Sequence, residues 1–171
     1  MNRGFLNLKR QRGVTLMEVL AVMIIGLLMI IGAFTLYSTT QNKQREGDIL
    51  TAMMTLQTNI RDLYYGKNSY EDISASTIVS AGAAPSTLVG SNGTSLVSPY
   101  DSASQVTITA GSGNAQFEIL VPAVPEDSCI SLSTKRGSFN SVEANGTAIE
   151  DISDATGACD GDDNEVTFIS N

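Results

Sequence analysis

Residues 13–36 read GVTLMEVLAVMIIGLLMIIGAFTL, and the expected architecture follows from this stretch. The run from Val19 to Leu36 is mostly apolar, and no charged residue occurs between Val19 and Asn42. As an α-helix, the run from Val19 to Leu36 would rise about 27 Å, which is close to the hydrocarbon thickness of a bilayer. The stretch therefore predicts a long N-terminal helix whose first half crosses a membrane.

The segment before this helix is basic. Residues 1–12 contain three arginines, one lysine and no acidic residue, and such a bias keeps a segment on the cytoplasmic side of a membrane. The apolar run is longer than the core of a cleavable secretory signal, and no small-residue cleavage site follows it in YSTTQNKQREGD (37–48). We therefore expect the rest of the chain to lie outside the cytoplasm.

One acid, Glu18, stands at the cytoplasmic end of the apolar run. A carboxylate at the centre of a membrane costs about 2.5–3.5 kcal/mol on insertion scales, and less near the edge. Two interpretations are open. Either the side chain reaches back to the aqueous interface, or it awaits a cationic partner.

Charge and composition exclude several classes of function. The net charge is −8, and it becomes −12 without the four basic residues of segment 1–12. So acidic a chain repels phosphates, and Lys135-Arg136 is too small a basic patch for a nucleic-acid partner. The chain has no histidine and shows no nucleophile with a base at suitable spacing. We expect neither an enzyme nor a bound cofactor or metal.

The two cysteines, Cys129 and Cys159, are expected to form a disulfide because the chain is exported to an oxidising compartment. In the chain-entropy model, closing a loop of about 30 residues stabilises a fold by about 3–4 kcal/mol. The alternative is two buried free thiols.

Beyond the membrane the pattern predicts more helix and then strands. Apolar residues at 49, 53, 56, 60 and 63 follow a 4-3-4-3 spacing, and Gly66 suits a helix C-terminus. Residues 67–104 are rich in Gly, Pro and Ser, which predicts irregular structure. Pro125 opens a short helix that carries Cys129, and Ser153 is expected to cap a short turn that leads to Cys159. Strands are predicted at 105–109, 116–121 and 165–170, with a hairpin at 141–149 that turns at Asn145-Gly146.

The segment Gly13-Val14-Thr15-Leu16-Met17-Glu18, after a basic leader and before an apolar helix, resembles the processing site of type IV pilins. The resemblance implies that prepilin peptidase cuts after Gly13, that Val14 becomes the N-methylated N-terminus, and that Glu18 pairs with the Val14 ammonium of a neighbouring subunit during assembly. A leader of 13 residues and a first mature residue that is valine resemble the type IVb branch.

The resemblance also implies a fold and a domain organisation. The expected class is α+β, a type IV pilin fold in which a long N-terminal α-helical spine packs on an antiparallel β-sheet. The divisions are a leader (1–13), a helix (14–65) with a membrane and assembly half (14–42) and an amphipathic half (43–65), and a globular head (66–171). The head comprises an αβ-loop (66–104) and the sheet with its disulfide-bounded region (105–171).

The expected function is that of a major pilin, which moves from the inner membrane into an extracellular homopolymer for adhesion, aggregation or mating contact. Its partners would be copies of itself, the prepilin peptidase, the inner-membrane assembly machinery and a host or cell-surface receptor. A minor pilin or a type II secretion pseudopilin is the alternative. A membrane-anchored enzyme or receptor domain is a third hypothesis, which predicts no cleavage after Gly13.

Two further motifs have ordinary explanations. Residues 160–165 (DGDDNE) imitate the start of an EF-hand loop, but the sixth position is Glu165 instead of glycine, so a solvated acidic turn is preferred to a calcium site. Asn92-Gly-Thr94 and Asn145-Gly-Thr147 match the glycosylation sequon, and turn formation is the preferred interpretation of both.

Overall fold

The computed structural model describes residues 15–171, apart from the side chains of residues 32–43. The first element is helix α1, Leu16–Leu63, which is 48 residues long. Residues up to Lys43 and residues 44–171 form two separate compact units. We call residues 44–171 the globular unit, and α1 enters it at Gln44.

The second half of α1 forms one wall of the core in the globular unit. Ile49, Met53, Leu56 and Ile60 are at most 3% exposed, as the 4-3-4-3 spacing predicts. The prediction was wrong at the last position, because Leu63 is 38% exposed and Tyr64 is buried in its place. The helix ends there, and Gly66 follows with a φ of +80°, a conformation that glycine adopts without steric cost.

The segment predicted to be irregular, 67–104, contains two short elements. Helix α2, Ala75–Ser80, begins at Ser74, whose hydroxyl accepts a hydrogen bond from the backbone N–H of Thr77. Strand β1, Leu96–Val97, pairs with β2. The sequence did not predict either element, because the polar residues around them are typical of loops. A serine such as Ser74 is favoured at a helix N-cap as well as in a turn.

Six strands form a sheet in the order β1-β2-β3-β6-β4-β5, in which every neighbouring pair is antiparallel. The strands of the predicted hairpins are present as β2 (Gln105–Ala110), β3 (Phe117–Val124), β4 (Ser141–Ala144) and β5 (Thr147–Ala148). The C-terminal strand β6, Asn164–Ser170, lies between β3 and β4. Asn145 and Gly146 both have positive φ at the β4–β5 turn, as a type I′ turn requires.

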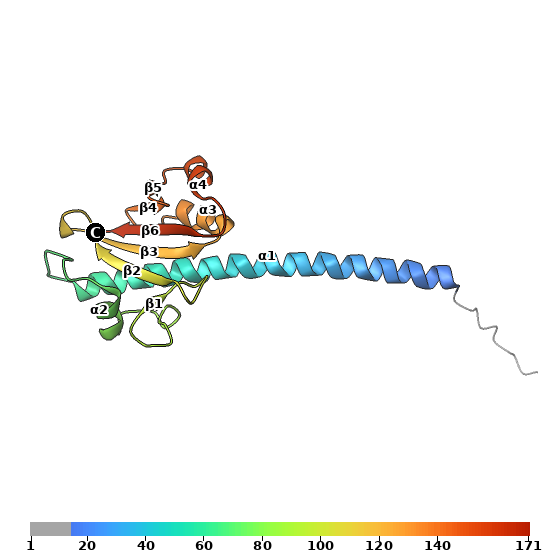
Figure 1. Ribbon diagram of the computed structural model, residues 1–171, viewed down its shortest axis with the longest axis horizontal. Helices are drawn as coiled ribbons and strands as arrows, with labels where there is room; N and C mark the ends of the chain where they lie inside the picture. The colour runs from blue at the N-terminus through green and yellow to red at the C-terminus, as the bar shows by residue number, and fades with distance from the viewer. Residues whose placement is uncertain (1–14) are drawn as a thin grey trace, which may run out of the picture. The chain divides into compact units, whose positions relative to one another are not determined.

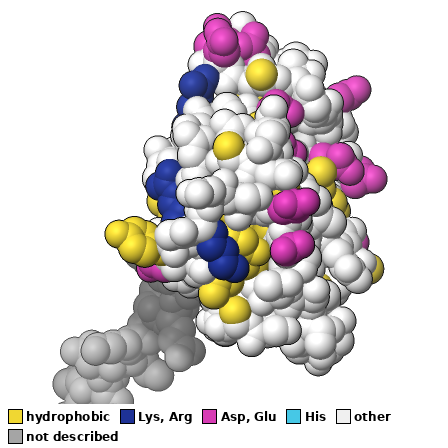
Figure 2. Space-filling view, turned by 90° about the vertical axis from the view of Figure 1, so that its left-hand side faces the viewer, with side chains coloured by type: hydrophobic (Ala, Val, Ile, Leu, Met, Phe, Trp, Pro, Cys, Tyr) yellow, Lys and Arg dark blue, Asp and Glu magenta, His cyan; other side chains and the backbone are white. Residues whose placement is uncertain are grey.

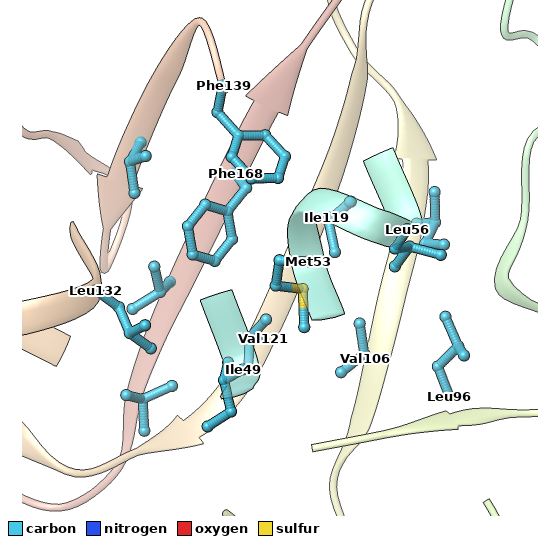
Figure 3. Packing of buried hydrophobic residues seen from close by; sticks show 14 of the residues in the cluster. Ile49, Met53, Leu56, Leu96, Val106, Ile119, Val121, Leu132, Phe139 and Phe168 are labelled. Atoms are coloured by element: carbon cyan, nitrogen blue, oxygen red, sulfur yellow. The ribbon is translucent and has the colours of Figure 1, made fainter. Parts of the chain in front are cut away.

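One face of the sheet packs against α1 to form the core. Alternate residues of β6 are buried, and the same period-two pattern occurs in β2 and the first half of β3. Figure 3 shows Met53 and Leu56 of α1 among side chains of β1, β2, β3 and β6. The architecture is therefore a helix on an antiparallel sheet, which confirms the predicted α+β class.

Two short helices cover the β4–β5 end of the sheet (Figure 1). Helix α3, Glu126–Thr134, begins after Pro125, with two acids in its first turn. Helix α4, Ile152–Ala158, is capped by Asp151. The prediction of Ser153 as the capping residue was wrong. Asp151 accepts from the backbone N–H groups of residues 153 and 154, and the Asp154 side chain accepts in return from the N–H of Asp151. This reciprocal cap outcompetes the serine hydroxyl.

Candidate processing and assembly site

The predicted cleavage residue Gly13 and the predicted N-terminus Val14 lie outside the described residues. Glu18 is described and lies in the first turn of α1, where its backbone N–H bonds to the carbonyl of Thr15. Unpaired N–H groups give this end of a helix a partial positive charge, which favours a carboxylate there.

Large apolar side chains surround this end of α1 and are exposed on every side. Between Leu16 and Ile31 their exposed fractions run from 46% at Val19 to 79% at Leu16. Exposed apolar surface of this extent marks a protein–protein or membrane contact. None of the described helices is long and apolar enough to cross a membrane. The predicted span over 19–36 runs into residues 32–36, whose side chains lie outside the described set.

A buried carboxylate joins α1 to α3 inside the globular unit. Glu46 is 8% exposed and accepts hydrogen bonds from the hydroxyls of Ser131, at 2.6 Å, and Ser128, at 3.3 Å. Lys135 Nζ lies 3.7 Å from Glu46 Oε2, and this is the only ion pair among the described residues. All three partners come from α3 or its C-cap, so Glu46 ties this helix to α1.

Tyr100 lies close to the same cluster. Burial raises the pKa of its hydroxyl, whose oxygen has no hydrogen-bond partner in the part of the chain that the structure describes. The hydroxyl of Ser128 is near enough to lower this pKa in part, but it donates to Glu46. The loop that carries Tyr100 therefore lies beside the hydrogen bond that joins Glu46 of α1 to Ser128 of α3.

We expect a Glu46→Ala variant to lose about 2–3 kcal/mol in the free energy of unfolding, because hydrogen bonds to a charged acceptor are worth about 1.5–3 kcal/mol. The ion pair with Lys135 adds little to this loss, since the lysine side chain is 53% exposed and its charge is screened by solvent. Denaturant unfolding of the full-length chain in detergent measures the change.

The matched control is Asp62→Ala, which removes the same charge from an exposed position of the same helix. It should change the free energy of unfolding by less than about 0.5 kcal/mol. Equal effects of the two substitutions would show that Glu46 does not hold α3 in place.

The predicted disulfide joins Cys129 of α3 to Cys159 at the end of α4, with a Cα–Cα distance of 5.9 Å. Both residues are buried, with exposed fractions of 0% and 3%. Helix α4 itself buries only Ala155. The covalent bond therefore holds a helix that has little apolar contact of its own.

The acidic turn before β6 is organised by a buried amide. Asn164 is 0% exposed, and its Nδ2 donates to the carbonyls of Val124 and Gly161. Its Oδ1 accepts from Asn145 Nδ2 and from the backbone N–H of Asp160, both at 2.8 Å. Within the described residues, no group of three acidic or cysteine side chains could hold a metal ion.

The asparagines of the two sequons use different atoms of their side-chain amides in hydrogen bonds. Asn145 Nδ2 donates to the carbonyl of Ala158 and to Asn164, so it serves the folded structure. Asn92 Oδ1 accepts from Thr94 N, Ser95 N and Ser95 Oγ, which is the bonding of a turn. Both asparagines therefore lie in turns, and the Asn145 amide also links the β4–β5 turn to the end of α4 and to Asn164.

A long N-terminal helix, an antiparallel sheet packed on its second half and a C-terminal disulfide together define the type IV pilin class. The family model described as "PilS N terminal" matches residues 41–171, and the model described as "Prokaryotic N-terminal methylation motif" matches residues 8–34. The chain belongs to the PilS N-terminal family of type IVb pilins, which are structural subunits and not enzymes.

Solved structures show the same likeness. The crystal structure of a type IVb pilin from Salmonella typhi matches at 27% identity and a TM-score of 0.57, over 73% of this chain and 99% of that one. The type IV pilin TcpA from Vibrio cholerae El Tor shares the fold at 14% identity and a TM-score of 0.57, over 75% and 99% of the two chains. A search of curated protein sequences found no match.

Proposed function

We propose that this chain is the major subunit of a type IVb pilus. A prepilin peptidase cuts it after Gly13 at the inner membrane, Val14 is methylated, and α1 then packs with the helices of neighbouring copies in an extracellular fibre. The observation that supports processing and helix packing most directly is the methylation motif over residues 8–34, which overlaps the start of α1, where the apolar side chains are exposed.

Glu18 has a specific role in this proposal. The freed ammonium of Val14 on one copy would meet the Glu18 carboxylate of the next. A buried charge is tolerated among apolar helices only when it is paired. The pair would therefore fix how far one helix is shifted along another.

We expect the mature protein to begin at Val14 and to carry one methyl group, which intact-mass measurement of the purified subunit detects. A Gly13→Val variant should keep its leader, because a Cβ beside the scissile bond obstructs the approach of the peptidase. Gly4→Val is the matched control, since it adds the same side chain elsewhere in the leader and should be cleaved normally. A mature chain that begins at Met1 would overturn the proposal.

The alternative is a minor pilin or a type II secretion pseudopilin, which the same peptidase would process. Sheared fibres separate these hypotheses. If this chain is the dominant protein of the preparation, it is the major subunit, and if it is a trace component beside another pilin, it is not. Adhesion, aggregation and mating contact remain proposed uses of the fibre, and a host or cell-surface receptor remains a proposed partner.

A further inference from the structure

A small apolar hollow opens on the surface of the globular unit, between α1 and the segment that precedes β1. Its volume is about 130 Å³. A cavity of about 150 Å³ with aliphatic walls can hold a group as large as benzene, so one branched aliphatic side chain fits this hollow. Its walls include Ile49, Ala52, Leu88 and Pro99, with the charged residues Arg45 and Asp48 at the α1 side.

One exposed aliphatic side chain stands elsewhere on the same unit. Ile152, the first residue of α4, is 67% exposed. Among the described residues after 31, the other large apolar side chains that are exposed are those of Leu63 and Tyr65. A β-branched side chain on a capped helix loses little conformational freedom when it docks, so Ile152 is suited to enter a pocket.

The hollow and Ile152 lie near opposite edges of the sheet. Leu88 is next to Val89, which bridges to Leu96 of β1, whereas α4 packs beside β5. The strand order places β1 and β5 at the two ends, and Figure 1 shows α4 and β1 on different sides of β3. Five strand spacings separate these edges by about 24 Å. Ile152 therefore cannot fill the hollow of its own copy, but it can fill that of another.

Both Arg45 and Asp48 lie at the hollow, and the charge of Arg45 is complementary to the acidic charge beside Ile152. Glu150 is exposed two residues before Ile152, and Arg45 is exposed beside the hollow. Neither side chain forms an ion pair within the described residues. Tyr65, in contrast, lies between Arg61 and Lys67 in the sequence. Both residues are positively charged like Arg45, so they would repel it. In Figure 2 acidic side chains gather at the top and right of the view, and basic ones lie mainly to the left.

We propose that Ile152 of one copy inserts into the hollow of the next copy, with Glu150 beside Arg45. This inference rests on the proposed fibre and names the contact between its globular units. The two surfaces are different and lie at opposite edges, so the contact is head-to-tail. A head-to-tail contact leaves one free surface at each end, so it does not close as a symmetric dimer and extends into a filament when the rotation between copies does not close a ring.

Cysteine pairing tests this contact in assembled fibres. A double variant, Ile152→Cys with Thr87→Cys, places one thiol at each surface, because Thr87 is exposed on the wall of the hollow. Mild oxidation should link most subunits into a ladder of multimers on a non-reducing gel. The native cysteines are buried in their own disulfide and do not interfere.

Three controls define the result. Each single cysteine variant should give no ladder, and Tyr65→Cys combined with Thr87→Cys should give none either. A ladder in the Tyr65 pair alone would place a different residue in the hollow and overturn the proposal. Dimers from Ile152→Cys alone would show a symmetric contact, which also contradicts it.

Charge reversal gives an independent measurement. Arg45→Glu and Glu150→Arg should each lower the yield of sheared fibre about tenfold or more, because each places like charges opposite one another. The double variant should restore the yield, which a purely structural role of either residue would not produce. Normal wild-type fibres with neither a ladder nor this rescue would overturn the contact alone, whereas absence of wild-type fibres would overturn the proposed function as well.

Discussion

A Glu18→Val variant should be cleaved and inserted into the membrane like the wild type, yet yield no fibre. In the proposed fibre, this substitution leaves the Val14 ammonium of the neighbouring copy without its carboxylate, among apolar helices. Removing one partner of a buried ion pair costs about 3–5 kcal/mol, which lowers each association step at least roughly 10²-fold. Fibre yield after shearing, normalised to the mature subunit in the membrane, measures the loss.

Met17→Val is the matched control for this experiment. It alters a neighbouring side chain that is 78% exposed on the same helical turn but leaves every charge in place. Its fibre yield should stay close to that of the wild type. If Glu18→Val assembled equally well, the carboxylate would only reach back to the aqueous interface, and the register of the helices would need another explanation.

The local patterns in the sequence were sufficient for most of the sheet. Alternating residues predicted β2, β3 and β6, and Asn145-Gly146 predicted the turn between β4 and β5 because both residues tolerate positive φ. The apolar stripe of α1 was predicted as far as Ile60. These features depend on residues that are only a few positions apart. A periodic pattern in the sequence is therefore sufficient to predict them.

The buried polar residues could not be predicted in this way. Glu46 finds its serine partners 82 and 85 positions later. Gln57 is 1% exposed, and its Nε2 donates to Ser138 O and to Ser170 Oγ, which is 113 positions away. In the sequence both residues look like solvent-facing positions of an amphipathic helix. Their burial becomes favourable only when distant hydroxyls and carbonyls satisfy them.

The substitutions Cys129→Ala and Cys159→Ala together should lower the free energy of unfolding by about 3–4 kcal/mol, as the loop of about 30 residues predicts. The effect should be largest at α4, because this helix buries only Ala155. Hydrogen exchange in the full-length chain should show α4 opening at a lower free energy than β3 and β6. Reduction of the wild type is the matched control, since it breaks the same bond without changing a residue.

Loss of the disulfide should also affect assembly. Ile152 is held on α4, and α4 is held by the disulfide, by the Asp151 cap and by the bond from Asn145 to the Ala158 carbonyl. Once the disulfide is broken, the residue that enters the neighbouring hollow loses its fixed position. Fibre yield should therefore fall in the double alanine variant even at temperatures where β3 and β6 stay protected from exchange. Unchanged yield under those conditions would mean that α4 contributes nothing to the contact between copies.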